Sequence, residues 1–437
     1  FMALPPEVLT TSMRSHQKYL ALDRPDGTLA PRFVVVADLE ATDGGTAIVA
    51  GNERVLRARL WDARFFWDQD RSRRLEERRD ALARMVFHAK LGAMADKADR
   101  LERLAIHLAE RLAIADPGDA ARAGALAKAD LVTGMVGEFP ELQGVMGAYY
   151  ARAQGERDAV ADAIGAHYAP QGPNDRCPTA PLAVVTALAD KLDSLAGFHA
   201  AGERATGSSD PLGLRRLALG VIRLVFENEL RLPLRDAFAE ARAGYGDDAD
   251  LAPAETVAEE LVAFVMDRLK VHLRSEDVRG DLIAAVFAAG ADDDLWRLRR
   301  KVAALQGFLE TADGANLLAA YRRARNIVRI EAKKDGEALA GEVRGELLEA
   351  PAEIALHHEL ATVMPQIRSA LAEERFTDAM VGLASLRAPV DKFFEEVLVN
   401  VDEPAVRANR LRLLARLSGL LDDVAVFDMI EEPRVAA

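Results

Sequence analysis

Apolar residues recur at helical spacing along most of this chain, and the stretch 123–150 is the clearest case. Apolar side chains fall on one face before Pro140 and again after it, which predicts two helices joined at Phe139-Pro140. Pro140 suits a first helical turn, where its missing N–H costs nothing. Gly144 and Gly147 remove side-chain bulk from one face. We therefore expect another helix to approach closely there, within a packed helical core.

One segment near the start of the chain departs from this pattern. Residues 33–36 and 47–49 are β-rich runs on either side of the turn-forming residues 43–45, which predicts a β-hairpin. It is the only convincing sheet in the sequence. From residue 54 to 112 the pattern is helical, and we expect aromatic residues such as Phe66 and Trp67 in the core rather than on a base-stacking surface.

Composition limits the class of protein. The chain has 437 residues, half of them hydrophobic, so it can bury several cores, and its scarcity of aromatic residues favours helices over sheets. Its one cysteine, Cys177, excludes a disulfide framework and a cysteine-rich zinc site, so we expect a reducing, cytoplasmic location. No apolar run reaches the ~20 residues of a membrane span, so we expect a soluble protein with no membrane partner.

The net charge of −14 argues against a protein that coats nucleic acid, because phosphate binding depends on cationic side chains. An RNA-binding face would have to concentrate its cations locally. Arg322, Arg325 and Arg329 fall on one predicted helix face, which indicates either RNA contact or an ordinary amphipathic surface helix. Arg14 and Lys18 belong to a second basic cluster, which indicates RNA or partner contact or a solvated helix end.

Asp130 follows an apolar helical pattern, and a half-buried carboxylate needs a partner. His88, the pair Ala129-Asp130, and Asp190 occur in the order of the HD-domain pattern, in which a His, a His-Asp pair and a final Asp bind metal. Ala129 stands where that pattern requires a second imidazole. Because a metal hydrolase needs all its ligands to activate water, we expect an HD-like fold without metal or the reaction. Asp130 and Asp190 would then be hydrogen-bonding core acids.

Several long motifs carry a specific resemblance. LAKADLVTGMVGEFPELQG at 126–144 is followed by HYAPQGPND at 167–175, ADKLDSLAGF at 189–198 and ATGSSDPLGLRRLALGVIRL at 205–224. In this order they resemble the β subunit of bacterial heterotetrameric glycyl-tRNA synthetase, and the resemblance covers almost the whole chain. The family's β subunit has a further N-terminal region without a counterpart here. Phe1 is not an initiator residue, so we expect a fragment or a processed product.

Near the other end, PVDKFFEEVLV at 389–399 and RANRLRLL at 407–414 resemble the helical anticodon-binding domain that this family shares with arginyl-tRNA synthetases. The resemblance implies that Arg407 and Arg410 grip the anticodon arm. We expect both to be exposed, on the side of their helix away from Leu413 and Leu417. Asn409 falls on or beside the buried stripe, so we expect its side chain to bond to backbone.

Neither class I nor class II synthetase signatures can be found, and the family places adenylate chemistry, with its ATP and magnesium, on the α subunit. The resemblance therefore implies a tRNA-binding subunit of an α2β2 ligase that positions tRNA-Gly. It implies no catalytic residue, cofactor or metal in this chain, and no binding to DNA. Two alternatives remain open: an HD phosphohydrolase, which Ala129 weakens, and a helical scaffold that binds only protein, which leaves the arginines unexplained.

The predicted fold is a mainly α, multidomain helical protein. We expect a small α+β segment at 1–68 with the hairpin, a degenerate HD-like helical domain at 69–245 and a helical body at 246–345. An anticodon-binding-like helical domain would occupy 346–437.

Overall fold

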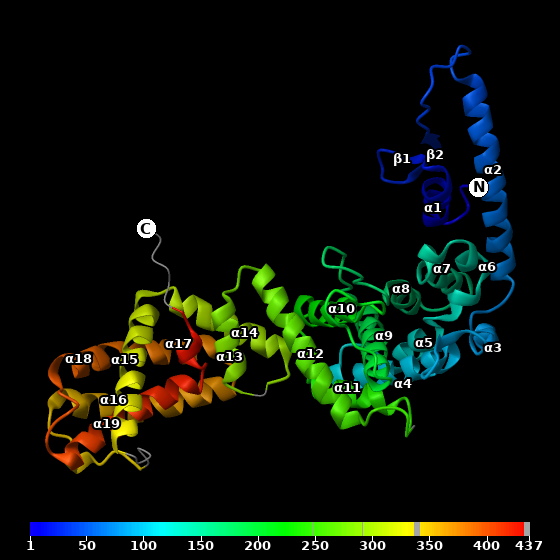
Figure 1. Ribbon diagram of the computed structural model, residues 1–437. Coiled ribbons are helices and arrows are strands. Elements are labelled where there is room, and N and C mark those ends of the chain that lie inside the picture. The colour runs from blue at the N-terminus through cyan, green and yellow to red at the C-terminus, as the bar shows by residue number, and fades with distance from the viewer. Residues whose placement is uncertain (248, 291, 336–340, 432–437) are drawn as a thin grey trace. The chain divides into compact units, whose positions relative to one another are not determined.

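The computed structural model describes residues 1–247, 249–290, 292–335 and 341–431. The chain is mainly helical, as predicted (Figure 1). It forms two compact units, one of residues 1–230 with 234–265 and one of residues 231–233 with 266–437. The four segments expected from the sequence divide the chain more finely and stay a prediction. None of the helices in the described ranges is long and apolar enough to span a membrane.

The first unit begins with α1 (Pro6–Gln17), an antiparallel hairpin of β1 (Leu20–Asp23) and β2 (Leu29–Val34), and α2 (Thr46–Arg71). The predicted hairpin is therefore wrong in its second strand, because residues 47–49 lie in α2. The carboxylate of Asp43 accepts the N–H groups of Gly45 and Ala47, both at 2.9 Å. Gly45 has a positive φ of 88°. Asp43 thus satisfies the N–H groups of the N-cap residue Gly45 and of Ala47 in the first turn, which favours a helix start here.

The rest of the first unit is a helical body with one further two-stranded hairpin. Its elements are η1 (Glu76–Arg78), α3 (Arg79–Leu82), β3 (Val86–His88), β4 (Gly92–Ala93), α4 (Met94–Leu112), α5 (Pro117–Leu126), η2 (Ala129–Val132), α6 (Gly134–Glu138), η3 (Pro140–Leu142), α7 (Val145–Ala153), α8 (Asp158–Ala166), α9 (Pro181–Ala200), α10 (Leu214–Glu227), α11 (Leu234–Ala243) and α12 (Ala254–Ser275), which continues into the second unit.

The stretch 123–150 is a series of short helices, so the prediction of two longer ones is wrong. The hydroxyl of Thr133 caps the start of α6. Gly144, just before α7, has a positive φ of 81°, so the chain turns there and no continuous helix can form. Pro140 does occupy the first turn of a helix, the short η3. The predicted close approach is confirmed at Gly147, where an added Cβ would lie 2.7 Å from the side chain of Ile164 in α8.

Helix α9 is the centre of the first unit. Residues 182–200 are all buried, and α4, α5, α8, α10 and α11 pack around the helix (Figure 1). A helix that is apolar on nearly every side is expected to be enclosed in this way. The few polar side chains of α9 are therefore enclosed too, and each must find a partner inside the protein.

The second unit is built from helices. Its elements are α13 (Gly280–Ala288), α14 (Leu295–Leu309), α15 (Ala312–Asp335), η4 (Gly345–Leu347), α16 (Pro351–Ala372), α17 (Phe376–Ser385), α18 (Arg387–Glu396), α19 (Pro404–Asp422) and η5 (Phe427–Met429). Helix α15 packs against α14, α18 and α19, and α16 packs against α17, α18 and α19.

The buried face of α19 follows the predicted stripe, with Leu413 and Leu417 in the core. The expectation for Asn409 is also confirmed. Its side-chain oxygen accepts the N–H of Arg344 at 2.8 Å, and its amide donates to the carbonyl of Arg344 at 2.9 Å. This pair of bonds fixes the segment before η4 against α19.

Candidate functional site

Two features could carry function: the charged side chains enclosed around α9 and the arginines of the second unit. The first set forms the α9 charge cluster, made of Lys97, Arg100, Lys128, Asp190 and Asp193. All five side chains are buried. They come from α4, from the residue before η2, and from α9.

Asp193 forms one half of the cluster. Its carboxylate lies 2.7 Å from Nε of Arg100 and 2.9 Å from Nζ of Lys97. Lys97 also donates to the hydroxyl of Ser194 at 2.8 Å, and the guanidinium of Arg100 lies 3.8 Å from the ring centroid of Tyr245. Two cations therefore neutralise one buried carboxylate, within a largely complete set of hydrogen bonds.

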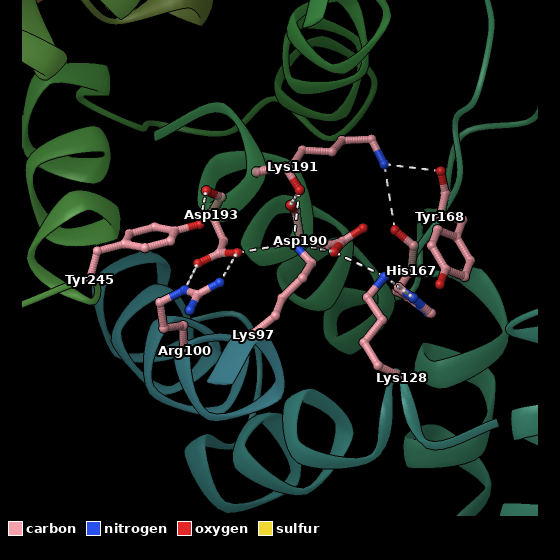
Figure 2. Close-up of polar contacts among 10 residues, drawn as sticks. Lys97, Arg100, Lys128, His167, Tyr168, Asp190, Lys191, Asp193 and Tyr245 are labelled. Atoms are coloured by element: carbon pink, nitrogen blue, oxygen red, sulfur yellow. Dashed lines mark hydrogen bonds and ion pairs between the residues drawn. The ribbon is translucent and has the colours of Figure 1, made fainter. Parts of the chain in front are cut away.

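Asp190 forms the other half, with its Oδ1 3.1 Å from Nζ of Lys97 and 3.0 Å from Nζ of Lys128. Figure 2 shows the ammonium group of Lys97 joined to both carboxylates. Burial by itself would raise the pKa of Asp190, but Lys128 and Lys97 outweigh it and hold this pKa well below its usual range. The Asp190 carboxylate is therefore ionised and already paired with two cations.

His167 completes the surroundings of Lys128. Its Nδ1 lies 2.6 Å from the carbonyl of Ile164, which can only accept, so Nδ1 carries the proton. Its Nε2 is then free to accept from the ammonium of Lys128 at 2.8 Å. Burial and the charge of Lys128 lower the pKa of His167 to about 3, so the imidazole is neutral at physiological pH. It acts here as a hydrogen-bond acceptor.

Lys191 lies beside the cluster and has a different kind of partner. Its ammonium donates to the carbonyl of Tyr168 at 3.1 Å (Figure 2). It also donates to the carbonyl of Ala169 at 2.9 Å. Burial lowers the pKa of Lys191 to about 8, against the opposing effect of Asp190. The side chain fits because Gly220 of α10 has no Cβ, which would lie 2.5 Å from Cε of Lys191. Lys191 thus fixes the start of the proline-rich loop after α8.

The positions that resemble the HD pattern are not brought together as a set of metal ligands in the part of the chain that the structure describes. His88 lies in β3, with Nε2 3.5 Å from Glu203, and its ring packs against Phe198. Ala129 is a buried residue of η2. Asp190 is paired with lysines, and among the residues described here no three His, Cys, Asp or Glu side chains are grouped to hold a metal ion. The metal content of the protein stays a prediction that elemental analysis can test.

Asp130 is a core acid, as expected, but its partners are backbone groups rather than side chains of other helices. Its Oδ2 accepts the N–H of Gly144 at 2.5 Å and of Gly147 at 2.9 Å. Burial raises the pKa of Asp130 to about 6, although the two N–H groups act to lower it. The carboxyl group therefore holds the start of α7 against η2.

The arginines of α15 are largely engaged within the second unit. Arg322 donates to the carbonyl of Ile430, and Arg325 pairs with Asp422 and Asp428, both at 3.2 Å. Arg329 is exposed and donates to Asn326 at 2.7 Å. The stripe predicted from the sequence exists, but its first two members stabilise the unit. Whether any of them contacts RNA stays a prediction.

The two arginines of α19 differ from each other. Arg407 is half-buried, less exposed than the sequence predicts, and pairs with Glu331. Arg410 is buried, with Nε 2.8 Å and Nη2 3.0 Å from the carboxylate of Glu353, so the expectation that it is exposed is wrong. It also donates to the carbonyl of Leu398 at 3.0 Å. The short loop after α18 brings this carbonyl to α19, a contact that helix periodicity does not reveal.

In the N-terminal segment, Arg14 and Lys18 are exposed at the C-terminal end of α1. The prediction that aromatic residues of α2 lie in the core needs correction. Phe66 and Trp67 are half-buried, while Trp61 and Phe65 are each 62% exposed.

The cations of the α9 charge cluster were not singled out from the sequence. A usable signal was present, because Asp190, Lys191 and Asp193 interrupt an otherwise apolar helix. Buried polar groups require partners, and Lys97 and Arg100 lie on one face of the amphipathic helix α4. The partner from outside that helix, Lys128, could not be assigned without the fold.

Comparison with known proteins decides the family. Residues 1–288 match the family model described as the glycyl-tRNA synthetase beta subunit, and residues 317–425 match the DALR anticodon binding domain. The chain belongs to the glycyl-tRNA synthetase beta-subunit family.

Relatives with the name glycine–tRNA ligase beta subunit agree with this assignment. The chain is 54% identical over 435 residues to the protein of Rhodospirillum centenum, covering 99% of this chain and 60% of the relative. It is 51% identical to that of Phenylobacterium zucineum and 46% identical to that of Cereibacter sphaeroides, covering 62% of each relative and 98% and 99% of this chain. The chain thus spans about three fifths of the length of these family members.

The family assignment confirms the resemblance found in the sequence motifs, both along most of the chain and in the C-terminal unit. The DALR match begins at Leu317 within α15 and ends at Ala425 after α19. In this beta-subunit family member, the arginines of α15 and α19 therefore lie inside the anticodon-binding domain.

Proposed function

We propose that this chain is the tRNA-handling part of a glycyl-tRNA synthetase. It recognises tRNA-Gly and positions it for ATP-dependent glycylation by the α subunit, which supplies the site for ATP and magnesium. The chain itself contributes no catalytic residue and holds no cofactor. The working enzyme is a cytoplasmic α2β2 ligase that does not bind DNA.

The match of residues 317–425 to an anticodon-binding domain is the observation that carries this proposal. Within that domain, Arg323 and Arg329 are exposed on α15. In the described ranges of the chain, neither forms an ion pair with a carboxylate, and the guanidinium of Arg323 lies 4.3 Å from the ring centroid of Phe394. Exposed arginines without carboxylate partners are the groups that can neutralise RNA phosphates.

The alternative of a metal-dependent phosphohydrolase has no support from the α9 charge cluster. Its carboxylates are paired with ammonium and guanidinium groups, and it offers no group that could activate water. We assign the cluster a structural role that keeps the first unit rigid.

Filter binding of tRNA-Gly to the full chain at two salt concentrations tests the proposal. Replacing Arg323 and Arg329 together by Ala should weaken binding and reduce the slope of log K against log[salt], because fewer counterions are released. Each lost phosphate contact should reduce the slope by about 0.7–0.9. A tRNA for another amino acid serves as the competitor that measures specificity.

The matched control changes two exposed arginines that already pair with carboxylates and are therefore not available to RNA phosphates. Arg368 and Arg375 are exposed arginines of the same unit that are ion-paired with Asp423 and with Glu373 and Asp378. Their double Ala variant should retain most of the affinity and slope. Equal behaviour of the two double variants, or no binding of tRNA-Gly by the unchanged chain, contradicts the proposal.

A further inference from the structure

One arginine of the anticodon-binding domain lies over an aromatic ring at the protein surface. The guanidinium carbon of Arg323 in α15 is 4.3 Å from the ring centroid of Phe394 in α18. Arg323 is exposed and Phe394 is half-buried. A guanidinium group at this distance is attracted to the face of the ring, which restricts the orientations of a long side chain. The pair therefore presents a planar cation in a restricted position.

The ring of Phe394 is itself held by the core of the second unit. Its neighbour Phe393 is completely buried, and the two rings pack edge-on with centroids 5.6 Å apart. Helices α15 and α18 pack against each other. The same helix contact therefore fixes the ring and the backbone that carries the guanidinium group.

Another arginine of the second unit shows what is unusual about Arg323. Arg300 also lies over a ring, that of Phe376, but it is ion-paired with Glu374 as well. In the described ranges of the chain, Arg323 forms no ion pair with a carboxylate. The guanidinium of Arg323 is thus ordered by a ring without being neutralised, which leaves its outer face for a ligand.

The helix surface beside Arg323 is open. Side chains of a helix lean toward its N-terminus, so the guanidinium group of Arg323 lies over the preceding turn. Ala319, one turn earlier, is exposed and contributes only a methyl group there. A flat ligand can therefore approach the guanidinium without meeting a bulky side chain from this turn.

A larger hollow in the same domain has the wrong charge for RNA. A pocket of about 760 Å³ lies between α16 and α17, and its charged residues are Glu359, Arg375 and Asp378. Arg375 already pairs with Asp378. Two carboxylates and one paired arginine repel phosphate groups, so the charge distribution favours the face of Arg323 over this pocket.

We propose that an unpaired base of the tRNA-Gly anticodon loop stacks on the guanidinium group of Arg323, with Phe394 as the positioning residue beneath it. This inference rests on the proposed function and deepens it, because a phosphate contact needs only charge whereas stacking needs a planar group. Proteins bind single-stranded RNA by stacking unpaired bases on aromatic rings or guanidinium planes. Stacking tolerates any base, so this contact holds the loop in place without reading its sequence.

Lysine at position 323 separates stacking from charge, because it keeps the cation and removes the planar group. The full chain with Arg323→Lys should bind tRNA-Gly about tenfold more weakly, as expected for one stacked base, with an unchanged slope of log K against log[salt]. Arg300→Lys is the matched control, since that exposed arginine also lies over a ring but is ion-paired. It should change neither the affinity nor the slope.

Transcripts of tRNA-Gly that each lack one base of the anticodon loop identify the stacked base. One of them should lose about as much affinity as Arg323→Lys, and combining the two changes should cost no more than either alone. Phe394→Leu should weaken binding in the unchanged chain but not in Arg323→Lys, which a merely structural role of the ring does not predict. Ala319→Leu, at an exposed position, should block the base while Arg323 and Phe394 remain.

Unchanged affinity in Arg323→Lys overturns the inference, because the arginine then contributes charge alone. Losses that add to that of Arg323→Lys for every transcript overturn it too, since no base then depends on the guanidinium plane. Both results leave the phosphate contacts of the proposed function standing. No binding of tRNA-Gly by the unchanged chain contradicts the proposed function and this inference together.

Discussion

Arg410 and Glu353 form a two-point ion pair inside the second unit, with Nε 2.8 Å from Oε2 and Nη2 3.0 Å from Oε1. Glu353 is completely buried and also accepts the N–H groups of Glu349 and Ala350, each at 2.6 Å. It therefore joins the start of α16 to α19. A guanidinium group matches a carboxylate at two points, which lysine cannot reproduce.

Replacing Arg410 by Ala should destabilise the second unit by about 3–5 kcal/mol, because it leaves a buried carboxylate without its counter-ion. Urea unfolding followed by circular dichroism measures this change. Adding Glu353→Gln should recover part of the loss, since the amide oxygen still accepts the two backbone N–H groups and no charge is left buried. A loss below about 0.5 kcal/mol, the size typical of an exposed residue, would show that the pair contributes little.

Arg410 also shows what helix periodicity can predict. Periodicity places Leu413, Leu417 and Asn409 correctly on the buried side of α19. It fails for Arg410, because an arginine next to that stripe can be enclosed once another helix supplies a carboxylate. Glu353 lies 57 residues away, so only the tertiary structure pairs it with Arg410. The same holds for Lys128 and Asp190 in the first unit.

The wrong strand at 47–49 has a local cause instead. Two β-rich runs around Asp43, Gly44 and Gly45 satisfy the usual pattern of a hairpin. The same three residues can also precede a helix, because the carboxylate of Asp43 can accept N–H groups at the start of the first turn. Asp43 does so through two hydrogen bonds, and the helix that follows extends for 26 residues. A short window of sequence does not separate these outcomes.

Replacing Asp190 by Asn should destabilise the first unit by about 3–5 kcal/mol. Lys97 would keep Asp193 and Ser194 as partners, whereas Lys128 would lose the one carboxylate with which it pairs among the described residues and keep the imidazole of His167 and the ring of Tyr168. The cost therefore arises mainly from one buried ammonium group without a carboxylate. Urea unfolding at pH 7 gives the value.

A second substitution identifies the source of that cost. Adding Lys128→Met to Asp190→Asn removes the unpaired charge and should restore most of the stability. The remaining deficit reflects Nε2 of His167, which then has no donor. If the double variant is no more stable than Asp190→Asn alone, the unpaired ammonium group of Lys128 is not the cause of the lost stability.

Asp130 should give the first unit a pH dependence in acid solution. Its pKa in the folded protein, about 6, is higher than in the unfolded chain, so folding favours the protonated carboxyl group. The stabilisation is complete below about pH 4 and is lost as the pH rises through 6. A shift of this size corresponds to about 3 kcal/mol.

The comparison of the unchanged chain with Asp130→Asn isolates this effect. Asn cannot ionise, yet its oxygen can still accept the N–H groups of Gly144 and Gly147. The variant should therefore gain stability relative to the unchanged chain between pH 4 and pH 7. Other groups, such as His167 with its lowered pKa, cancel in the difference. If the free energies of unfolding of the two proteins depend on pH in the same way, the pKa of Asp130 in the folded protein is near its ordinary value.

Gly124 allows α5 to lie directly against α4, and its replacement tests how rigid that contact is. An added Cβ would lie 2.7 Å from the carbonyl oxygen of Leu101 and 2.8 Å from the backbone of Glu102. Because these are helix backbone atoms, they cannot move aside as a flexible side chain would. Gly124→Ala should lower the free energy of unfolding by about 1–3 kcal/mol, because the added methyl group overpacks this contact.

Gly137→Ala in α6 is the matched control, since no atom lies within 4 Å of its added Cβ. That change should stabilise the helix by up to about 1 kcal/mol. Equal melting temperatures for the two variants would mean that α4 and α5 can separate without loss of other contacts.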